Sequence, residues 1–195
     1  MWDDRYSDKE YAYGKIANDF LQQTSSRIPA GRVLCLAEGE GRNAVFLAQQ
    51  GYDVVAVDSS AVGLEKARLL ATEMGVVIET IHADLADFDI GENRWQAIVS
   101  IFCHVPPAIR KKIHKSIFKG LVDNGVFILE AYTPDQIELG TGGPKDSALT
   151  MTRDILQKEC TDLTIEYINE IERDINEGKY HTGKGAVVQL FAVKK

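Results

Sequence analysis

Apolar runs alternate with helix-forming segments over the first two thirds of the chain, and this order limits the possible folds more than any other feature. The runs begin at Arg32, Tyr52, Val76, Trp95 and Val126. Strands that are apolar along their whole length are buried on both faces of a sheet. Because helical segments follow the first, second and fourth runs, we expect an α/β fold with a doubly wound, mostly parallel sheet.

The last third of the chain has a different pattern. Residues 133–150 are polar and contain Gly142, Gly143 and Pro144, and a long irregular stretch in a compact domain is usually functional, so we expect it to form an active-site wall. A short helix is predicted over residues 153–159. Two alternating segments flank the turn EGKYHTGKG and predict a terminal antiparallel hairpin.

Composition excludes several classes of protein. The 195 residues are 45% hydrophobic, which is enough for one core, so a single domain over residues 1–195 is expected. The net charge of −7 disfavours nucleic acid and anionic lipid as partners. No apolar run approaches the roughly 20 residues of a membrane span, and the charged N-terminus is unlike a signal peptide, which favours a cytoplasmic location. Cys35, Cys103 and Cys160 are widely spaced, so free thiols and no metal are expected.

The first strand-to-helix turn, residues 37–43, contains Gly39 and Gly41. Open parallel sheets bind ligands at this kind of turn, because glycines let the backbone approach a ligand and the next helix directs free N–H groups toward it. Asp58 ends the second run, where a carboxylate can accept hydrogen bonds from both ribose hydroxyls. Asp84 ends the third run and is placed to accept from an adenine amino group. These residues predict an adenosine site.

Spacing alone does not separate a dinucleotide from other adenosine ligands, since Gly39, Gly41 and Ala44 also fit the dinucleotide fingerprint. Charge separates them. A diphosphate would lie near Glu38 and Glu40, and like charges about 4 Å apart cost on the order of 4 kcal/mol at an effective dielectric of about 20. S-adenosylmethionine carries a sulfonium and no phosphate, so these acids would attract it. Alternatively, both glutamates point to solvent and merely start the next helix.

Segments spread over nearly the whole chain form a set: VLCLAEGEGRNAVFLA, VVAVDSS, HADL, IVSIFCHVPP, GVFILEAYTP, and the N-terminal W-x-x-R-Y followed by YAYG. Through these segments the chain resembles the class I S-adenosylmethionine-dependent methyltransferases, and more narrowly the tellurite-resistance and thiopurine methyltransferases. The resemblance implies a Rossmann-like seven-stranded sheet in the order 3-2-1-4-5-7-6, with an antiparallel seventh strand. It also implies S-adenosylmethionine as donor and S-adenosylhomocysteine as product.

The resemblance divides the chain into three parts. Residues 1–30 are expected to form a helical lid, residues 31–133 the donor-binding half, and residues 134–195 the acceptor-side loop and hairpin. The N-terminal aromatic residues either close over the ligands as this lid or pack a helix onto the core. The predicted donor-binding residues are Ala37, Glu38, Gly39, Gly41, Asn43, Asp58, Ser59, Asp84, Leu85 and Ser100.

Two positions depart from the family pattern, which has an acid in the first strand and a glycine two residues later. This chain has Cys35 and Ala37 instead. Alanine is expected to replace that glycine only if its φ is negative. Glu38 is the candidate for the missing carboxylate, in which case Glu38→Gln should weaken binding of the donor.

The acceptor side is expected just after the fourth run, at Ser100, Phe102, Cys103 and His104. His104 is the predicted catalytic residue, since its near-neutral pKa suits it to orient or deprotonate an acceptor. Alternatively, it caps the following turn. Cys103 is expected to pack in the core rather than to act as a nucleophile. His181 belongs either to the acceptor wall or to the hairpin turn.

The predicted function is methyl transfer from S-adenosylmethionine to a small molecule, either a thiol, a chalcogen oxyanion, a halide or another metabolite. The sequence Val105-Pro106-Pro107-Ala108 differs from the N/D-P-P-Y/F tetrad of DNA and protein amine methylation, and no separate substrate domain is evident. The alternatives are a non-catalytic S-adenosylmethionine-binding module and an NAD-dependent oxidoreductase. A monomer or weak homodimer is expected.

Overall fold

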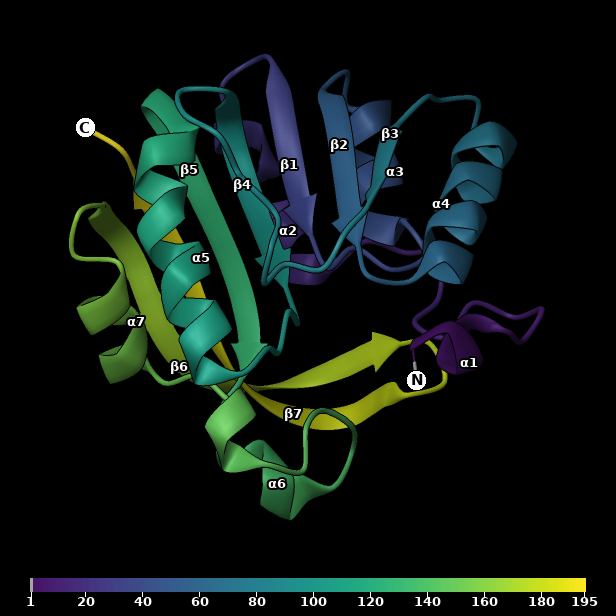
Figure 1. Ribbon diagram of the computed structural model, residues 1–195. Helices are drawn as coiled ribbons and strands as arrows, with labels where there is room; N and C mark the ends of the chain where they lie inside the picture. The colour runs from purple at the N-terminus through teal and green to yellow at the C-terminus, as the bar shows by residue number, and fades with distance from the viewer. Residues whose placement is uncertain (1) are drawn as a thin grey trace.

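A seven-stranded sheet runs through the molecule, and helices lie on both of its faces (Figure 1). The computed structural model describes residues 2–195. The strand order is β3-β2-β1-β4-β5-β7-β6, with only β7 antiparallel to its neighbours, which confirms the predicted order and the terminal hairpin. The strands are β1 (Arg32–Leu36), β2 (Asp53–Asp58), β3 (Glu79–His82), β4 (Trp95–Ile101), β5 (Leu121–Tyr132), β6 (Thr164–Glu177) and β7 (His181–Val193).

Side chains of each central strand alternate between two cores. In β1, Val33 and Cys35 pack on the side of α2, α3 and α4, whereas Leu34 and Leu36 pack on the side of α5 and α7. This two-sided burial explains why the strands are apolar along their length. The helices are α1 (Trp2–Tyr6), α2 (Asp19–Thr24), α3 (Arg42–Gln49), α4 (Ala61–Glu73), α5 (Pro107–Gly120), α6 (Gln136–Leu139) and α7 (Arg153–Glu159), with 3-10 turns η1 (Ser25–Arg27) and η2 (Ser147–Leu149).

Local signals fix most helix ends. The hydroxyl of Ser60 accepts from the Gly63 N–H (3.0 Å) and begins α4, and the hydroxyl of Thr152 accepts from the Ile155 N–H (3.2 Å) and begins α7. Pro107 is the first residue of α5, as expected of proline. Helix α7 has the bounds expected from the sequence.

Three segments differ from expectation. The N-terminal part contains only α1, α2 and η1, and residues 7–18 between the first two helices are irregular, so it is less helical than expected. The loop over residues 133–150 contains α6 and η2. Strand β5 begins at Leu121 rather than at Val126, and its pairing with β4 shifts register between these two residues. No helix within residues 2–195 is long and apolar enough to cross a membrane.

Candidate active site

The glycine turn between β1 and α3 lies at the carboxyl edge of the sheet, beside the end of β2. Gly39 and Gly41 have φ of 62° and 90°, in the left-handed region that favours glycine. The Gly39 N–H donates to Oδ2 of Asp58 (2.8 Å), and Oδ1 of Asp58 accepts from the Ser60 N–H (2.7 Å). The turn and the carboxylate at the end of β2 are therefore joined by direct hydrogen bonds.

Ala37 enters this turn with a φ of 48°. The condition stated from the sequence, a negative φ at this position, is therefore not met. A left-handed conformation costs a residue with a Cβ about 1–2 kcal/mol, so the turn holds backbone strain where the family pattern has glycine.

Glu38 is buried, which excludes the interpretation that it points to solvent. Its Oε1 accepts from the N–H groups of Asn43 (2.9 Å) and Ala44 (2.8 Å), the first free donors of α3. Burial raises the pKa of Glu38 to about 7 despite these hydrogen bonds and the nearby Arg42. The carboxyl group thus occupies the helix N-terminus that a phosphate would need.

Glu40 is also buried, but it binds the N-terminal segment rather than facing the turn. Its Oε2 accepts from the Ala12 N–H (2.7 Å), and its Oε1 forms an ion pair with Lys66 of α4. Lys66 also donates to the carbonyl oxygens of Asp8 (2.9 Å) and Glu10 (2.7 Å). Glu40 therefore does not belong to the acidic surface that the sequence predicted around the ligand.

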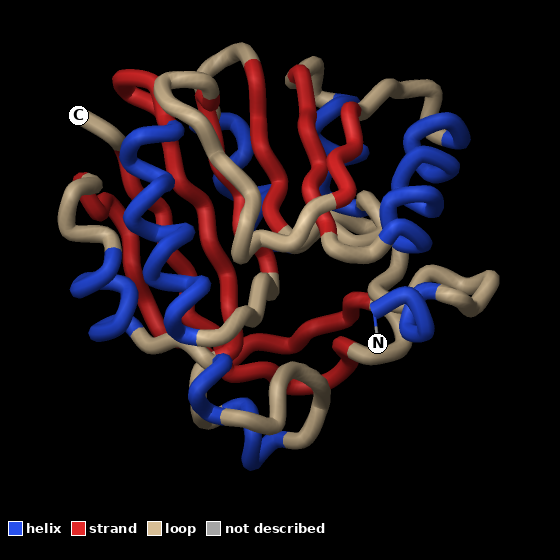
Figure 2. The backbone as a smooth tube through the Cα atoms, viewed as in Figure 1, coloured by secondary structure: helices blue, strands red, loops and turns tan. Residues whose placement is uncertain are grey.

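The N-terminal segment, residues 2–15, covers the glycine turn. A Cβ built on Gly39 would lie 2.6 Å from the Tyr6 hydroxyl, and Trp2 stacks on Tyr6 with ring centroids 5.9 Å apart. Asp3 accepts a hydrogen bond from the Ser60 hydroxyl at the start of α4. Figure 2 shows α1 beside the end of α4 that faces the same edge of the sheet.

The other predicted donor-binding residues lie around this edge. Ser59 follows β2 and is exposed, and its carbonyl accepts from Nε2 of His82 (3.1 Å). Asp84 is exposed two residues beyond β3 and accepts from the Ala86 N–H (2.8 Å). Leu85 packs in the core, and Ser100 is buried in β4. No ligand contact tests these assignments, so they stay predictions.

On the acceptor side, five rings from distant segments meet in an aromatic cluster, defined by Tyr13, Phe102, His104, Tyr132 and His181. The ring of His181 lies 4.5 Å from Tyr13, 4.8 Å from Phe102 and 5.2 Å from Tyr132, between ring centroids. The rings of Phe102 and Tyr132 stack at 4.5 Å. Phe102 has a φ of 52°, and backbone strain of this kind is frequent at functional sites.

His104 has both ring nitrogens occupied by the main chain. Nδ1 donates to the Leu149 carbonyl (2.9 Å), and Nε2 accepts from the Tyr132 N–H (3.3 Å). Burial lowers the pKa of His104 to about 4. This geometry favours the alternative in which His104 holds the turn after β4, and its catalytic role stays a prediction that the contacts do not support.

His181 has a different environment. It is buried, its Nδ1 has no hydrogen-bond partner among residues 2–195, and Oε2 of Glu177 lies 3.8 Å from that nitrogen. Burial lowers the pKa of His181, while Glu177 acts in the opposite direction. Burial alone would raise the pKa of Glu177, but its contacts with His181, Arg42 and Asn18 hold it at about 2.

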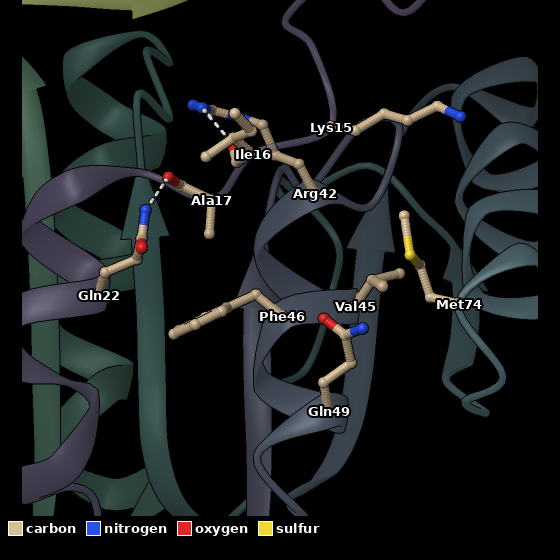
Figure 3. A pocket seen from close by; sticks show the side chains of 9 residues that line it. All are labelled: Lys15, Ile16, Ala17, Gln22, Arg42, Val45, Phe46, Gln49 and Met74. Atoms are coloured by element: carbon tan, nitrogen blue, oxygen red, sulfur yellow. Dashed lines mark hydrogen bonds between the residues drawn. The ribbon is translucent and has the colours of Figure 1, made fainter.

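Thiols and cavities add little to the site. Cys35, Cys103 and Cys160 are all buried, and burial raises the pKa of Cys103 to about 12, which suits packing rather than nucleophilic attack. Within residues 2–195, no three histidine, cysteine or acidic side chains are grouped as metal ligands would be. A cavity of about 160 Å³ beside α3 contains none of the predicted site residues (Figure 3); its walls are Lys15, Ile16, Ala17, Gln22, Arg42, Val45, Phe46, Gln49 and Met74.

Comparison with known proteins agrees with this geometry. Residues 33–125, which include the glycine turn and the first four strands, match the sequence profile of a methyltransferase domain. The glycine/sarcosine N-methyltransferase of Halorhodospira halochloris is 32% identical over 142 residues, which cover 70% of this chain and 52% of that protein. Residues 33–125 are therefore those of a methyltransferase domain. The chain spans about half the length of the curated relatives it matches.

Solved structures show the same methyltransferase fold over the full chain. TehB from Haemophilus influenzae superposes with a TM-score of 0.76 at 23% identity, covering 100% of this chain and 68% of that one. A protein solved in work on the conversion of a disulfide bond into a thioacetal group during echinomycin biosynthesis gives a TM-score of 0.79 at 16% identity, covering 100% and 91%. The resemblance and the sheet order inferred from the sequence are confirmed.

The aromatic cluster was not predicted as a unit. Sequence reasoning placed Phe102, His104 and His181 near the acceptor separately and left Tyr132 out. The sequence held a signal for Tyr132. Phe102 directly follows β4 and Tyr132 ends β5, and these two strands were predicted to be neighbours. Glu177 gave no such signal, because it lies in an alternating strand rich in acids.

Proposed function

We propose that the protein transfers a methyl group from S-adenosylmethionine to a small-molecule acceptor. The observation that carries this proposal is the position of Glu38. Its carboxyl group accepts the N–H groups of Asn43 and Ala44 at the start of α3. In dinucleotide-binding sheets these donors hold phosphate oxygens. The occupied helix end thus opposes a nicotinamide cofactor and fits a nucleoside donor without phosphate.

The charges around the turn support the same donor. Arg42 is paired with Glu177 at 2.6 Å, and Lys66 is paired with Glu40, so neither cation is free to hold a phosphate. Asp58 is buried beside Gly39 without an ion-pair partner among residues 2–195. A carboxylate in this position suits ribose hydroxyls and attracts a sulfonium cation. The donor-binding residues proposed from the sequence fit this group.

The donor supplies an already activated methyl group, so the protein mainly has to align the acceptor and exclude water. The glycine turn brings the backbone of Gly39 next to Asp58, and the aromatic cluster lies beyond the ends of β4 and β5. We propose that the N-terminal segment, with Tyr6 over the turn, closes on the bound donor.

A small acceptor is part of this proposal. Two of the curated relatives are named glycine/sarcosine N-methyltransferases, and the acceptor side of this chain is a set of rings rather than an extended basic surface. The net charge of −7 opposes a nucleic-acid acceptor. A cytoplasmic location and a monomeric or weakly dimeric state stay predictions from the sequence.

Titration calorimetry tests the donor. We expect S-adenosylmethionine and S-adenosylhomocysteine to bind and NAD not to bind. Asp58→Asn should weaken binding about 10-fold or more, because charged hydrogen bonds contribute about 1.5–3 kcal/mol. Asp53→Asn is the matched control, since Asp53 begins the same strand and is exposed in an ion pair with Arg32. Binding of NAD with no binding of S-adenosylmethionine would overturn the proposal.

A further inference from the structure

His181 is a buried histidine whose contacts do not explain its burial. Its Nδ1 has no hydrogen-bond partner among residues 2–195, and its nearest acid, Glu177, lies 3.8 Å away. Buried polar groups are normally hydrogen-bonded, and exceptions are often found where a group serves chemistry. His104 in the same cluster shows the contrast, because the main chain satisfies both of its nitrogens. His181 is the histidine that keeps capacity to take up a proton.

Glu177 is fixed beside His181 by a network of donors. Its carboxylate accepts from Arg42 Nη2 (2.6 Å), from Asn18 Nδ2 (2.9 Å) and from Arg173 Nη2 (3.3 Å). These contacts keep Glu177 ionised and leave it little freedom to move. A fixed carboxylate facing one ring nitrogen orients the imidazole and favours its protonated form.

The groups around His181 also indicate what kind of acceptor fits. Arg42 and Arg173 are both paired with buried glutamates, and Arg5 donates to the Tyr13 hydroxyl (3.3 Å) and lies over the Tyr180 ring. An anionic acceptor such as a halide or an oxyanion therefore finds the nearby cations already engaged by other side chains. The titratable and charged side chains around His181 are Arg5 of α1, Tyr13 of the N-terminal segment, Arg42 of α3, His104 after β4, Tyr132 of β5, Glu177 of β6 and Tyr180 of the hairpin turn.

Resting on the proposed methyl transfer, we propose that His181 takes the proton from a neutral acceptor that loses one on methylation, a thiol or an amine, with Glu177 as its positioning residue. The lone pair of the acceptor sulfur or nitrogen forms the bond to the methyl carbon. The carbon–sulfur bond of the donor breaks, and its electron pair stays on sulfur. The acceptor's proton passes to Nε2 of His181, the ring nitrogen that does not face Glu177, and then to water.

Proton NMR of the histidine ring hydrogens tests this dyad without any acceptor. The chain has four histidines, so His181→Gln assigns the His181 signal directly. Glu177→Gln should lower the pKa of His181 by about 1, because an adjacent opposite charge stabilises the imidazolium. Asp174→Asn, an exposed acid of the same strand, is the control and should leave that pKa unchanged. An unchanged pKa in Glu177→Gln would overturn the positioning role.

Activity assays test the proton transfer and the acceptor class. Formation of S-adenosylhomocysteine is measured with 2-mercaptoethanol, benzylamine, iodide and tellurite. We expect turnover with the thiol or the amine, and a loss of about 100-fold in kcat for His181→Gln with an unchanged Kd for S-adenosylmethionine. With the thiol, the loss should shrink as the pH approaches the thiol pKa, because the thiolate then forms without a base. His114→Gln is the control. His114 of α5 is paired with Glu159 of α7 at 2.8 Å, and its removal should leave the pH profile unchanged.

The outcomes separate the two proposals. Absence of S-adenosylmethionine binding would overturn the proposed function itself. Donor binding with turnover only of iodide or tellurite, with no turnover of any probe, or with a pH profile that His181→Gln does not change, would overturn the role of His181 and leave the donor assignment standing.

Discussion

Glu38 and Glu40 are two residues apart in one turn, yet their carboxyl groups have different partners. Glu38 binds the N-terminus of the helix that follows, and Glu40 binds residue 12 and Lys66. Both are buried, so each must be paired to be tolerated. At the residue scale, the turn is therefore defined as much by these internal contacts as by its glycines.

The raised pKa of Glu38 predicts how stability depends on pH. Burial raises the pKa of Glu38 to about 7 in the folded state, whereas a glutamate in an unfolded chain keeps its ordinary pKa of 4.5. Between these values the folded state binds more protons, so the free energy of unfolding decreases as the pH rises, by about 3 kcal/mol from this group. Urea unfolding from pH 5 to 8 should show this decrease in the wild type and a flatter profile in Glu38→Gln. Identical profiles would contradict the prediction.

Relief of strain at Ala37 is a second prediction. Because Ala37 has a φ of 48°, Ala37→Gly should raise the free energy of unfolding by about 0.5–1 kcal/mol, even though glycine loses more entropy on folding. Thermal and urea unfolding measure the change. Asn124→Gly is the comparison, since Asn124 also has a positive φ (63°) but asparagine tolerates it, so its gain should be smaller. A destabilised Ala37→Gly would show that the alanine methyl group outweighs the strain.

The sequence predicted the backbone of this turn better than its side chains. Gly39, Gly41 and Asp58 were identified because strand ends and glycine spacing are local signals. The partners of Glu40 were not, because residue 12 and Lys66 are distant in sequence and only the fold brings them together. The sign of φ at Ala37 was not predictable from local sequence either, because it depends on the conformation of the whole turn.

At the scale of elements, the N-terminal segment shows how a nonperiodic stretch becomes ordered. Only α1 in it is α-helical, and residues 7–15 lack the apolar period that predicts a helix. Lys66 of α4 holds the segment in place instead, because its ammonium binds carbonyl oxygens of the segment and the carboxylate of Glu40. The regular strands and α7 were predictable, whereas this segment depended on one distant side chain.

Removal of that ammonium should release the segment. Lys66→Met keeps the apolar stem of the side chain but leaves three carbonyl contacts and a buried carboxylate without their cation. Hydrogen exchange of amides in residues 2–15 should become about 10-fold faster or more, since local opening becomes easier. Arg68→Met, an exposed residue of the same helix paired with Glu65, should not change it. Unchanged exchange in Lys66→Met would show that aromatic packing alone holds the segment.

At the scale of the whole molecule, a buried polar network joins the two ends of the chain. Glu130 of β5 is fully buried and accepts from Asn18 (2.7 Å), Gln189 (2.5 Å) and Arg173 (2.5 Å). These donors come from the start of α2 and from both strands of the terminal hairpin. The network therefore ties the hairpin and the N-terminal helices to the central sheet.

Loss of Arg173 should destabilise the whole fold. Arg173→Met leaves Glu130 buried without its cation, and breaking a buried pair in this way costs about 3–5 kcal/mol. Equilibrium unfolding in urea measures the change. Lys184→Met removes an exposed pair with Glu172 on the same hairpin and should cost less than about 1 kcal/mol. Equal effects of the two substitutions would refute the idea that burial decides the cost.

Arg42 stands at the first position of α3, directly after the glycine turn, while the carboxylate it pairs with lies next to His181. This ion pair consequently connects the glycine turn with the surroundings of His181. A displacement of the turn on binding of S-adenosylmethionine would move this ion pair and so change the affinity for the acceptor. Binding of the acceptor must then change the affinity for S-adenosylmethionine by the same factor. Equilibrium titration of each ligand with and without the other should then show that each changes the dissociation constant of the other by the same factor.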